Sequence, residues 1–174
     1  MYRDVVAMAK SFHRLSMATP VIRLSSLIGA FSGSVNKIVL DFMGFDGTDF
    51  GVPMHNELMF GATMYAVCTA SYVDMRRRGL DVSALRYEDL VARPLDMCRV
   101  VLEFCHMPVS LAELAVKAFE VDSHRNSVLS ESAIGHVKAP ELTPETKKQL
   151  NELMKKFGLP LLDEPRILEG SLSC

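Results

Sequence analysis

Apolar side chains recur at helical spacing in several parts of the chain. Over residues 3–16 they fall on one face of a predicted helix, for which Asp4 is a suitable N-cap. A longer helix is predicted from about Asn56 to Arg78, because basic side chains and then Gly79 follow its apolar pattern. Its expected buried stripe consists of Phe60, Met64, Val67, Ser71 and Met75.

Three further helices are predicted in the second half of the chain, over residues 94–105, 110–121 and 144–157. The first has a proline in its opening turn, and the second begins with a capping box at Ser110. The third begins after Thr143, a favourable N-cap residue, and ends where glycine and proline follow.

The apolar pattern is weak from residue 19 to residue 51, where glycine and serine interrupt it. Two short helices are predicted there, over residues 22–30 and 34–43. A loop through residues 46–49 follows, of the kind that forms substrate lids. At the other end of the chain, residues 161–174 are expected to be extended and docked in part on the rest of the protein.

One segment, Val82–Tyr87, reads as a buried strand that runs into a turn at Pro94. In open α/β sheets, ligands bind beyond the carboxyl ends of the strands, and Tyr87, Glu88 and Asp89 lie at that end here. A strand needs partners for its backbone groups, yet no other segment has a clear strand pattern. We therefore expect this strand to keep at least one unpaired edge.

Composition narrows the class of protein. The 174 residues suffice for a single domain, and a net charge of −2 gives no electrostatic basis for binding nucleic acid. The uncharged run at residues 58–73 is short for a membrane span and favours a buried core helix. The four cysteines lack metal-ligand spacing, so we expect reduced thiols, three of them buried. Together with charged residues near the start of the chain, this predicts a cytoplasmic location.

Arg3 and Ser11 are the first candidates for binding a ligand. Backbone amides at a helix N-terminus attract anions, and an arginine beside them adds a fork of donors matched to phosphate oxygens. Ser11 lies two turns along the same side of the predicted helix. From residue type alone, the simpler interpretation is that Arg3 is a surface residue and that Ser11 has no role in binding.

Tyr87 suits either stacking on a flat ring or core packing at a strand end. Glu88 and Asp89 are expected to point apart, as neighbours on a strand do, so they do not predict an acid/base pair. Asp89 is instead expected to cap the following turn. The three arginines at residues 76–78 suit a phosphate site or, more simply, favourable charge at a helix C-terminus.

Other catalytic patterns do not emerge from the sequence. The five histidines show neither metal-ligand spacing nor an order typical of a catalytic triad, so no metal site and no catalytic residue is predicted in this chain. The glycines near residues 29–33 lack the Lys-Ser/Thr pair of a phosphate-binding loop.

Four stretches together resemble the later part of a sulfotransferase that uses 3′-phosphoadenosine 5′-phosphosulfate (PAPS). They are Tyr2-Arg-Asp-Val-Val-Ala-Met-Ala-Lys-Ser11, Leu85-Arg-Tyr-Glu-Asp-Leu-Val-Ala-Arg-Pro94, Val101-Leu-Glu-Phe-Cys105 and Asp122-Ser-His-Arg-Asn-Ser-Val-Leu-Ser130. The second is the most specific, and their order and spacing fit the family. The end of the chain, Ile167-Leu-Glu-Gly-Ser-Leu172, is similar to the tails of some members, more loosely.

The resemblance implies a fold class and a set of binding residues. It implies a single partial domain over residues 1–174, the mostly helical C-terminal part of a P-loop-like three-layer α/β fold with few strands. It also implies that Arg3 and Ser11 bind the 3′-phosphate of the cofactor PAPS, while Tyr87 and Ser123 contact the adenine.

The chain also departs from the family pattern. The lysine-containing loop that grips the phosphosulfate and the usual histidine base are expected before residue 1, so this chain alone is expected to be inactive. The Arg-Lys-Gly triplet that closes over the 3′-phosphate is missing, and Arg125 or Lys138 are the candidates to replace it. The chain is then a fragment, the product of a truncated gene model or a degenerate copy.

Two functions follow as expectations. The first is sulfuryl transfer from PAPS to the hydroxyl or amine of a small-molecule acceptor, with this chain supplying the 3′-phosphate and adenine side of the cofactor site. The alternative is a non-catalytic helical interaction protein, or a degenerate remnant of the family, that binds a partner through apolar faces left uncovered. Self-association through the same faces is also expected.

Overall fold

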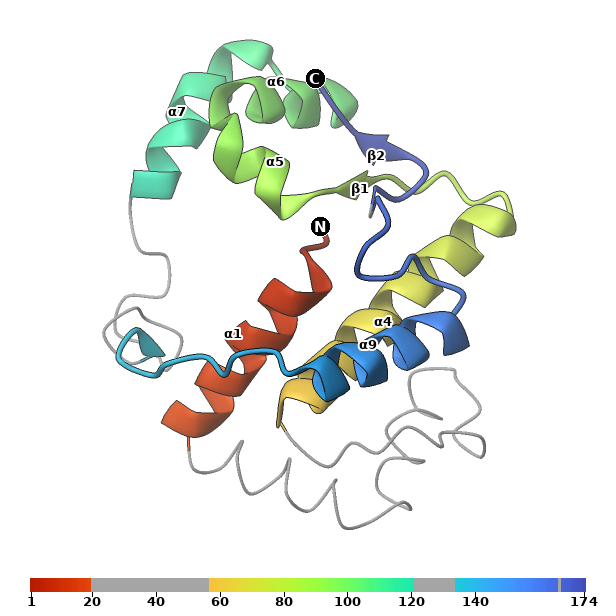
Figure 1. Ribbon diagram of the computed structural model, residues 1–174. Helices are drawn as coiled ribbons and strands as arrows, with labels where there is room; N and C mark the ends of the chain where they lie inside the picture. Colours follow the sequence, from red (N-terminus) through yellow and green to blue (C-terminus); the bar gives the residue numbers. More distant parts are fainter. Residues whose placement is uncertain (20–56, 121–133, 166) are drawn as a thin grey trace.

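The computed structural model describes residues 1–19, 57–120, 134–165 and 167–174. Helices dominate these residues, and one short parallel sheet joins them (Figure 1). The expected fold class, mostly helical with few strands, is confirmed at this level. The helices predicted at residues 22–30 and 34–43, the loop at 46–49 and the stretch 122–130 lie outside the described residues.

Helix α1 (Val5–Ala18) forms where the sequence predicts it, since the side chain of Asp4 accepts a hydrogen bond from Ala7 N at 3.0 Å. It packs closely against α4 (Glu57–Arg77). Gly61 makes this approach feasible, because a Cβ atom at that position would lie 2.6 Å from Phe12 Cβ. The rings of Phe12 and Phe60 then meet with their centroids 5.2 Å apart.

The predicted position of α4 is confirmed, whereas its predicted buried stripe is wrong. Of that stripe Val67 is fully buried, while Phe60 and Met64 are half-buried and Met75 is exposed. The reason is that α1 and α9 (Pro144–Lys156) both pack on α4, so its first two thirds are buried on several faces. Among the described residues, no helix is long and apolar enough to cross a membrane.

Helix α9 begins as predicted, because Thr143 Oγ1 accepts a hydrogen bond from Thr146 N at 3.1 Å. Its apolar side completes the larger of two core clusters. The buried residues of this lower core are Val5, Ala9, Leu58, Met59, Ala62, Tyr65, Ala66, Leu150, Leu153, Met154 and Leu159.

A second helical group consists of α5 (Tyr87–Ala92), α6 (Pro94–Phe104) and α7 (Ala112–Lys117), with 3₁₀ turns η2 (Val109–Leu111) and η3 (Ala118–Glu120) on either side of α7. Its core is small: Leu90, Met97, Cys98 and Ala112. In Figure 1 this group lies above α1, α4 and α9.

Two further expectations are wrong, one for a residue of this upper group and one for the cysteines. Ser110 does not cap a helix, because it already lies inside the turn η2 and lacks the extended backbone that an N-cap needs. The four cysteines are free, but Cys98 is the one that is buried, whereas Cys68, Cys105 and Cys174 are exposed. Cys68 is on α4, Cys105 follows the last residue of α6 and Cys174 lies at the end of the tail, and none of the three belongs to either core cluster.

The strand is shorter than predicted and better paired. Strand β1 (Ala84–Leu85) runs parallel to β2 (Ser171–Leu172), and Tyr2 forms a parallel bridge with Arg86 on the other edge. The expectation of an unpaired edge at these residues is therefore wrong. The missing partners come from the two ends of the described chain, and the expected docking of the tail is confirmed.

The tail reaches β1 over Gly170, whose φ of +76° few other residues adopt readily. Gly170 O accepts a hydrogen bond from Ala84 N at 3.2 Å, and Tyr72 Oη donates to Glu169 O at 2.7 Å. A Cβ atom on Gly170 would lie 2.9 Å from Tyr72 Oη and 3.0 Å from Arg76 Nε. The tail thus fits closely against the last turns of α4.

Candidate functional site

Three of the four predicted binding residues come together where α1 meets α5. Arg3 Nη1 donates a hydrogen bond to Ser11 Oγ at 3.1 Å. The Cζ atom of Arg3 also lies 4.7 Å from the centroid of the Tyr87 ring, so the guanidinium covers one face of that ring. The fourth residue, Ser123, lies outside the described residues.

Backbone pairing fixes this arrangement. Tyr2 N donates to Leu85 O, and Tyr87 N donates to Tyr2 O, both at 2.8 Å. Because Tyr2 and Arg86 are bridge partners, the next residue on each segment, Arg3 and Tyr87, leaves the bridge in the same direction. Each segment then enters a helix, and the helices α1 and α5 carry the rest of the site.

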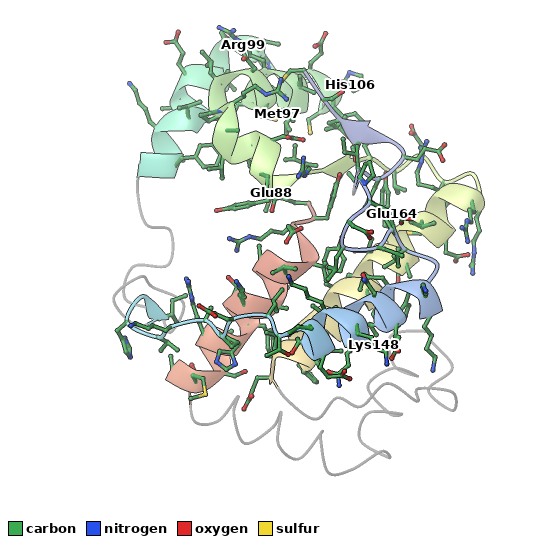
Figure 2. The ribbon with its side chains drawn as sticks, viewed as in Figure 1. Glu88, Met97, Arg99, His106, Lys148 and Glu164 are labelled. Atoms are coloured by element: carbon green, nitrogen blue, oxygen red, sulfur yellow. The ribbon has the colours of Figure 1, made fainter. Side chains whose placement is uncertain are left out.

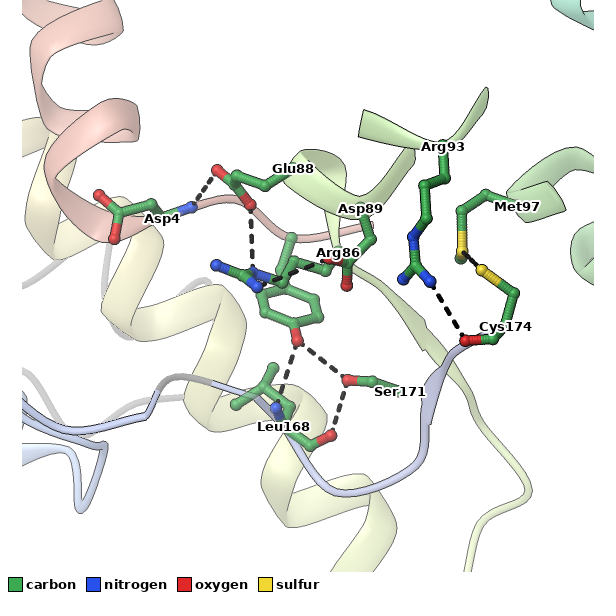
Figure 3. Close-up of polar contacts among 10 residues, drawn as sticks. Asp4, Arg86, Glu88, Asp89, Arg93, Met97, Leu168, Ser171 and Cys174 are labelled. Atoms are coloured by element: carbon green, nitrogen blue, oxygen red, sulfur yellow. Dashed lines mark hydrogen bonds and ion pairs between the residues drawn. The ribbon is translucent and has the colours of Figure 1, made fainter. Parts of the chain in front are cut away.

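Glu88, which the sequence placed at the end of the strand without a binding role, is a structural residue of this site. Its Oε1 accepts a hydrogen bond from Asp4 N at 2.9 Å and so ties α5 to the start of α1 (Figure 3). In Figure 2, Glu88 lies between these two helices, whereas Arg99 and His106 lie at the far side of the upper group. A signal existed in the sequence, since Glu88 is the polar residue directly after Tyr87.

The expectation that Glu88 and Asp89 follow the end of a strand is wrong, because residues 87–92 form a helix. Arg86 Nε lies 3.5 Å from Glu88 Oε2 and Arg86 Nη1 lies 3.6 Å from Asp89 Oδ1, so one guanidinium is the ion-pair partner of both carboxylates. Neighbouring residues on a helix do not face each other, so the helix does not predict an acid/base pair either. Asp89 also lies inside this helix rather than capping the following turn.

Two amides at the start of α1 already have protein acceptors. Asp4 N donates to Glu88, and Ala7 N donates to the side chain of Asp4. An anion beside Arg3 would therefore depend less on the helix N-terminus than the sequence suggests. Its main donors would be the guanidinium of Arg3 and the hydroxyl of Ser11 on the side of the helix.

The donor set fits a phosphate next to a planar ring. Arg3 Nε, like the Nε atoms of Arg14 and Arg76, is buried without a hydrogen-bond partner in the part of the chain that the structure describes. It is the position of Arg3 beside Ser11 and Tyr87 that sets it apart. Leaving such a buried donor unsatisfied destabilises the protein by about 1–3 kcal/mol, whereas the contact of the guanidinium with the aromatic face stabilises it by about 0.5–2 kcal/mol. Ser11 Oγ accepts from Arg3 and keeps its own O–H for donation. The residues present therefore match a ligand that carries both an anion and a flat ring.

Two of the three arginines at the end of α4 have protein partners, and the third is exposed. Arg76 Nη1 donates to Val82 O at 3.3 Å and lies against the tail at Gly170. Arg78 forms an ion pair with Asp74 at 2.7 Å, and Arg77 is exposed. These contacts favour the simpler interpretation of charge at a helix C-terminus over a phosphate site.

One of the two residues considered as replacements for the Arg-Lys-Gly triplet is described. Arg125 lies outside the described residues, and Lys138 is exposed on the segment that leads to α9. In the ranges that the structure covers, no group of three or more His, Cys, Asp or Glu side chains is arranged to hold a metal ion.

Comparisons of the chain with protein-family models, with curated proteins and with solved structures found no significant match.

Proposed function

We propose that this chain supplies the 3′-phosphate and adenine side of a PAPS-binding site in a sulfotransferase with a P-loop-like three-layer α/β fold. The observation that carries the proposal is the convergence of Arg3, Ser11 and Tyr87, which are 84 residues apart at the extremes and meet through one backbone bridge. The sequence resemblance independently assigned these residues to one ligand.

Each residue has a distinct role in this proposal. Arg3 offers charged N–H donors and Ser11 a neutral O–H donor to the oxygens of the 3′-phosphate. Tyr87 offers the adenine a flat ring and a phenol hydroxyl. When bound, the cofactor supplies the sulfuryl group that passes to a hydroxyl or amine of a small-molecule acceptor. No residue of the chain is assigned to the transfer step, so the purified 174-residue chain should bind nucleotide without turning it over.

The experiment compares two nucleotides by calorimetric titration of the 174-residue chain at fixed salt, because phosphate contacts weaken with ionic strength. Adenosine 3′,5′-bisphosphate should bind about ten- to a hundredfold more tightly than adenosine 5′-monophosphate, which lacks the 3′-phosphate. Equal affinities would show that the chain has no 3′-phosphate site.

The second candidate function is a non-catalytic interaction protein that self-associates. The observation in its favour is apolar exposure on the upper helical group, where Leu114 is 66% exposed and Phe119 is 51% exposed. The remaining exposed apolar side chains of this group are Val91, Phe104, Met107, Val109 and Leu111.

Sedimentation velocity distinguishes the two candidates. If self-association is the function, the Leu114→Gln/Phe119→Ser double variant should be a monomer at concentrations where the parent chain is an oligomer. Nucleotide affinity should be the same in both proteins, since both side chains are largely exposed and lie on α7 and η3, whereas the site is formed by Arg3, Ser11 and Tyr87. A parent chain that is monomeric throughout would remove the second candidate.

A further inference from the structure

The guanidinium of Arg3 has two partners that belong to two different parts of the proposed ligand. It donates to Ser11 Oγ, where a phosphate would bind, and it covers the face of Tyr87, where a base would stack. Stacked aromatic rings have centroids about 4.5–7 Å apart, and Arg3 Cζ is 4.7 Å from the ring centroid. Arg3 and a stacked base therefore need the same space on this face.

The orientation of Arg3 also indicates that it moves when a phosphate binds. A bidentate arginine–phosphate pair uses two parallel N–H groups, which are those of Nη1 with Nη2 or of Nη2 with Nε. Here Nη1 donates to Ser11 and Nε is buried, so each of these pairs contains one donor that is engaged or enclosed. A bidentate phosphate therefore requires the guanidinium to turn from its present position. That turn withdraws it from the Tyr87 ring.

We propose that Arg3 closes the Tyr87 face, and that an anion bound through Arg3 opens it for a planar base. A charge-assisted bidentate bond to phosphate is stronger than the contact between a guanidinium and an aromatic face, so the anion prevails in the competition for Arg3. Phosphate and base then bind cooperatively, and by linkage each raises the affinity for the other by the same factor.

This inference rests on the proposed function and adds a selection rule to it. A base without phosphate can stack on Tyr87 only if its own binding free energy breaks the contact between Arg3 and the ring. In a ligand that carries both groups, the bond from Arg3 to the phosphate offsets the loss of that contact. The site therefore selects nucleotides with a phosphate near the base over free nucleosides. The selection exceeds what the direct phosphate contacts alone would give.

The test titrates adenosine into the 174-residue chain with saturating inorganic phosphate, and again with chloride at equal ionic strength. Phosphate should raise the affinity for adenosine about three- to tenfold, the factor that corresponds to one cation–π contact. In the Arg3→Ala variant, adenosine should bind equally well in both buffers. An affinity for adenosine that phosphate leaves unchanged or lowers in the parent chain would overturn the inference.

A second readout does not depend on nucleotide affinity or on the stability of a variant at Arg3. The chain has four tyrosines and no tryptophan, so its tyrosine emission can be measured directly. Phosphate alone should change this emission in the parent chain, because Arg3 leaves Tyr87, and should not change it in Tyr87→Phe. No change in the parent chain would overturn the inference.

The outcomes separate the two proposals. If adenosine 3′,5′-bisphosphate binds through Arg3 but phosphate does not raise the affinity for adenosine, the proposed function is supported and the proposal that Arg3 closes the Tyr87 face is wrong. If the bisphosphate does not bind at all, both fall.

Discussion

The lower and upper helical groups are held together in different ways. The lower core has eleven buried apolar residues, of which α1, α4 and α9 carry all but Leu159, whereas α5, α6 and α7 share four. Large apolar side chains of the upper group, such as Leu114 and Phe119, remain exposed. Hydrophobic burial therefore stabilises the lower group far more than the upper one.

Polar and backbone contacts supply the connection between the groups. Tyr2 bridges to Arg86 and shares a hydrogen bond of 3.0 Å with Ser171, while Leu168 N donates to Tyr2 Oη at 3.3 Å (Figure 3). Arg93 Nη1 donates to the carbonyl of Cys174 at 3.3 Å. The candidate site lies at this junction, so the position of Tyr87 against Arg3 depends on contacts that are individually weak.

The largest predicted effect is on the lower group. In Gly61→Ala the new Cβ would lie 2.6 Å from Phe12 Cβ and 3.2 Å from the backbone Cα of Ala9, and neither atom can retreat without moving α1. We expect a loss of about 3 kcal/mol in the free energy of unfolding, which exceeds the roughly 1 kcal/mol gained in helix propensity. Urea unfolding followed by circular dichroism measures it.

Cys68→Ala is the control for this variant, since it changes an exposed residue of the same helix and should cost less than about 0.5 kcal/mol. A Gly61→Ala protein as stable as Cys68→Ala would show that α1 and α4 are not in close contact at Gly61.

A smaller effect is predicted at the junction, where two glycines have nearly the same backbone. Gly170 and Gly79 have φ of +76° and +78°, but a Cβ on Gly79 would meet nothing within 4 Å. Each Gly→Ala change should cost about 1–2 kcal/mol of backbone strain. Gly170→Ala should cost about 1 kcal/mol more, because it displaces Tyr72 from its hydrogen bond to Glu169.

Hydrogen exchange locates this additional loss. The amide of Ala84, which donates to Gly170 O, should exchange faster in Gly170→Ala and unchanged in Gly79→Ala. Equal exchange rates in the two variants would mean that the tail does not depend on the close fit at Gly170.

The smallest effect concerns pH. Burial raises the pKa of Tyr72 above its ordinary value near 10, because ionisation would place a charge in a partly desolvated position. The resulting stability is fully present below about pH 10 and is lost as the pH rises through the raised pKa. Ionisation also removes the O–H that donates to Glu169 O.

The free energy of unfolding measured from pH 8 to 11.5 should therefore fall more steeply in the parent chain than in Tyr72→Phe. Burial also raises the pKa of the Cys98 thiol, which makes both proteins lose stability above about pH 9. The difference between the two curves isolates Tyr72. Parallel curves would contradict its role in holding the tail.

Features that depend on neighbouring residues were predicted from the sequence more often than features that depend on packing between distant segments. The caps at Asp4 and Thr143 were predictable because a helix N-cap involves residues two or three positions apart. The buried faces of α4 were not, since they depend on α1 and α9 packing on it from two sides. The upper group shows the same limit at Ser110, where a neighbouring turn changes the backbone on which a capping box depends.

The candidate site was predictable only in part for the same reason. The spacing of Arg3 and Ser11 placed them on one side of α1, and they form a hydrogen bond there. Their neighbour Tyr87 depends on a single bridge between Tyr2 and Arg86, which is too short to leave an alternating pattern in the sequence. The role of Glu88 was missed because Tyr87, Glu88 and Asp89 were expected at the end of a strand, whereas they form the first turn of a helix.

The central claim is that Arg3 is a phosphate-binding residue at the junction of the two groups. Arg3→Ala and Arg14→Ala each remove one positive charge from the same segment, so long-range electrostatic effects nearly cancel between them. They differ in position, because Arg14 lies about 16 Å further along the helix axis than Arg3.

Calorimetric titration with adenosine 3′,5′-bisphosphate at fixed salt compares the two variants most directly. Arg3→Ala should bind about ten- to a hundredfold more weakly than Arg14→Ala, as expected for the loss of a charge-assisted hydrogen bond of about 1.5–3 kcal/mol. Ser11→Ala should lose less, since its hydroxyl is a neutral donor. Equal affinities of the two arginine variants would contradict the account and leave Arg3 as a residue that merely packs on Tyr87.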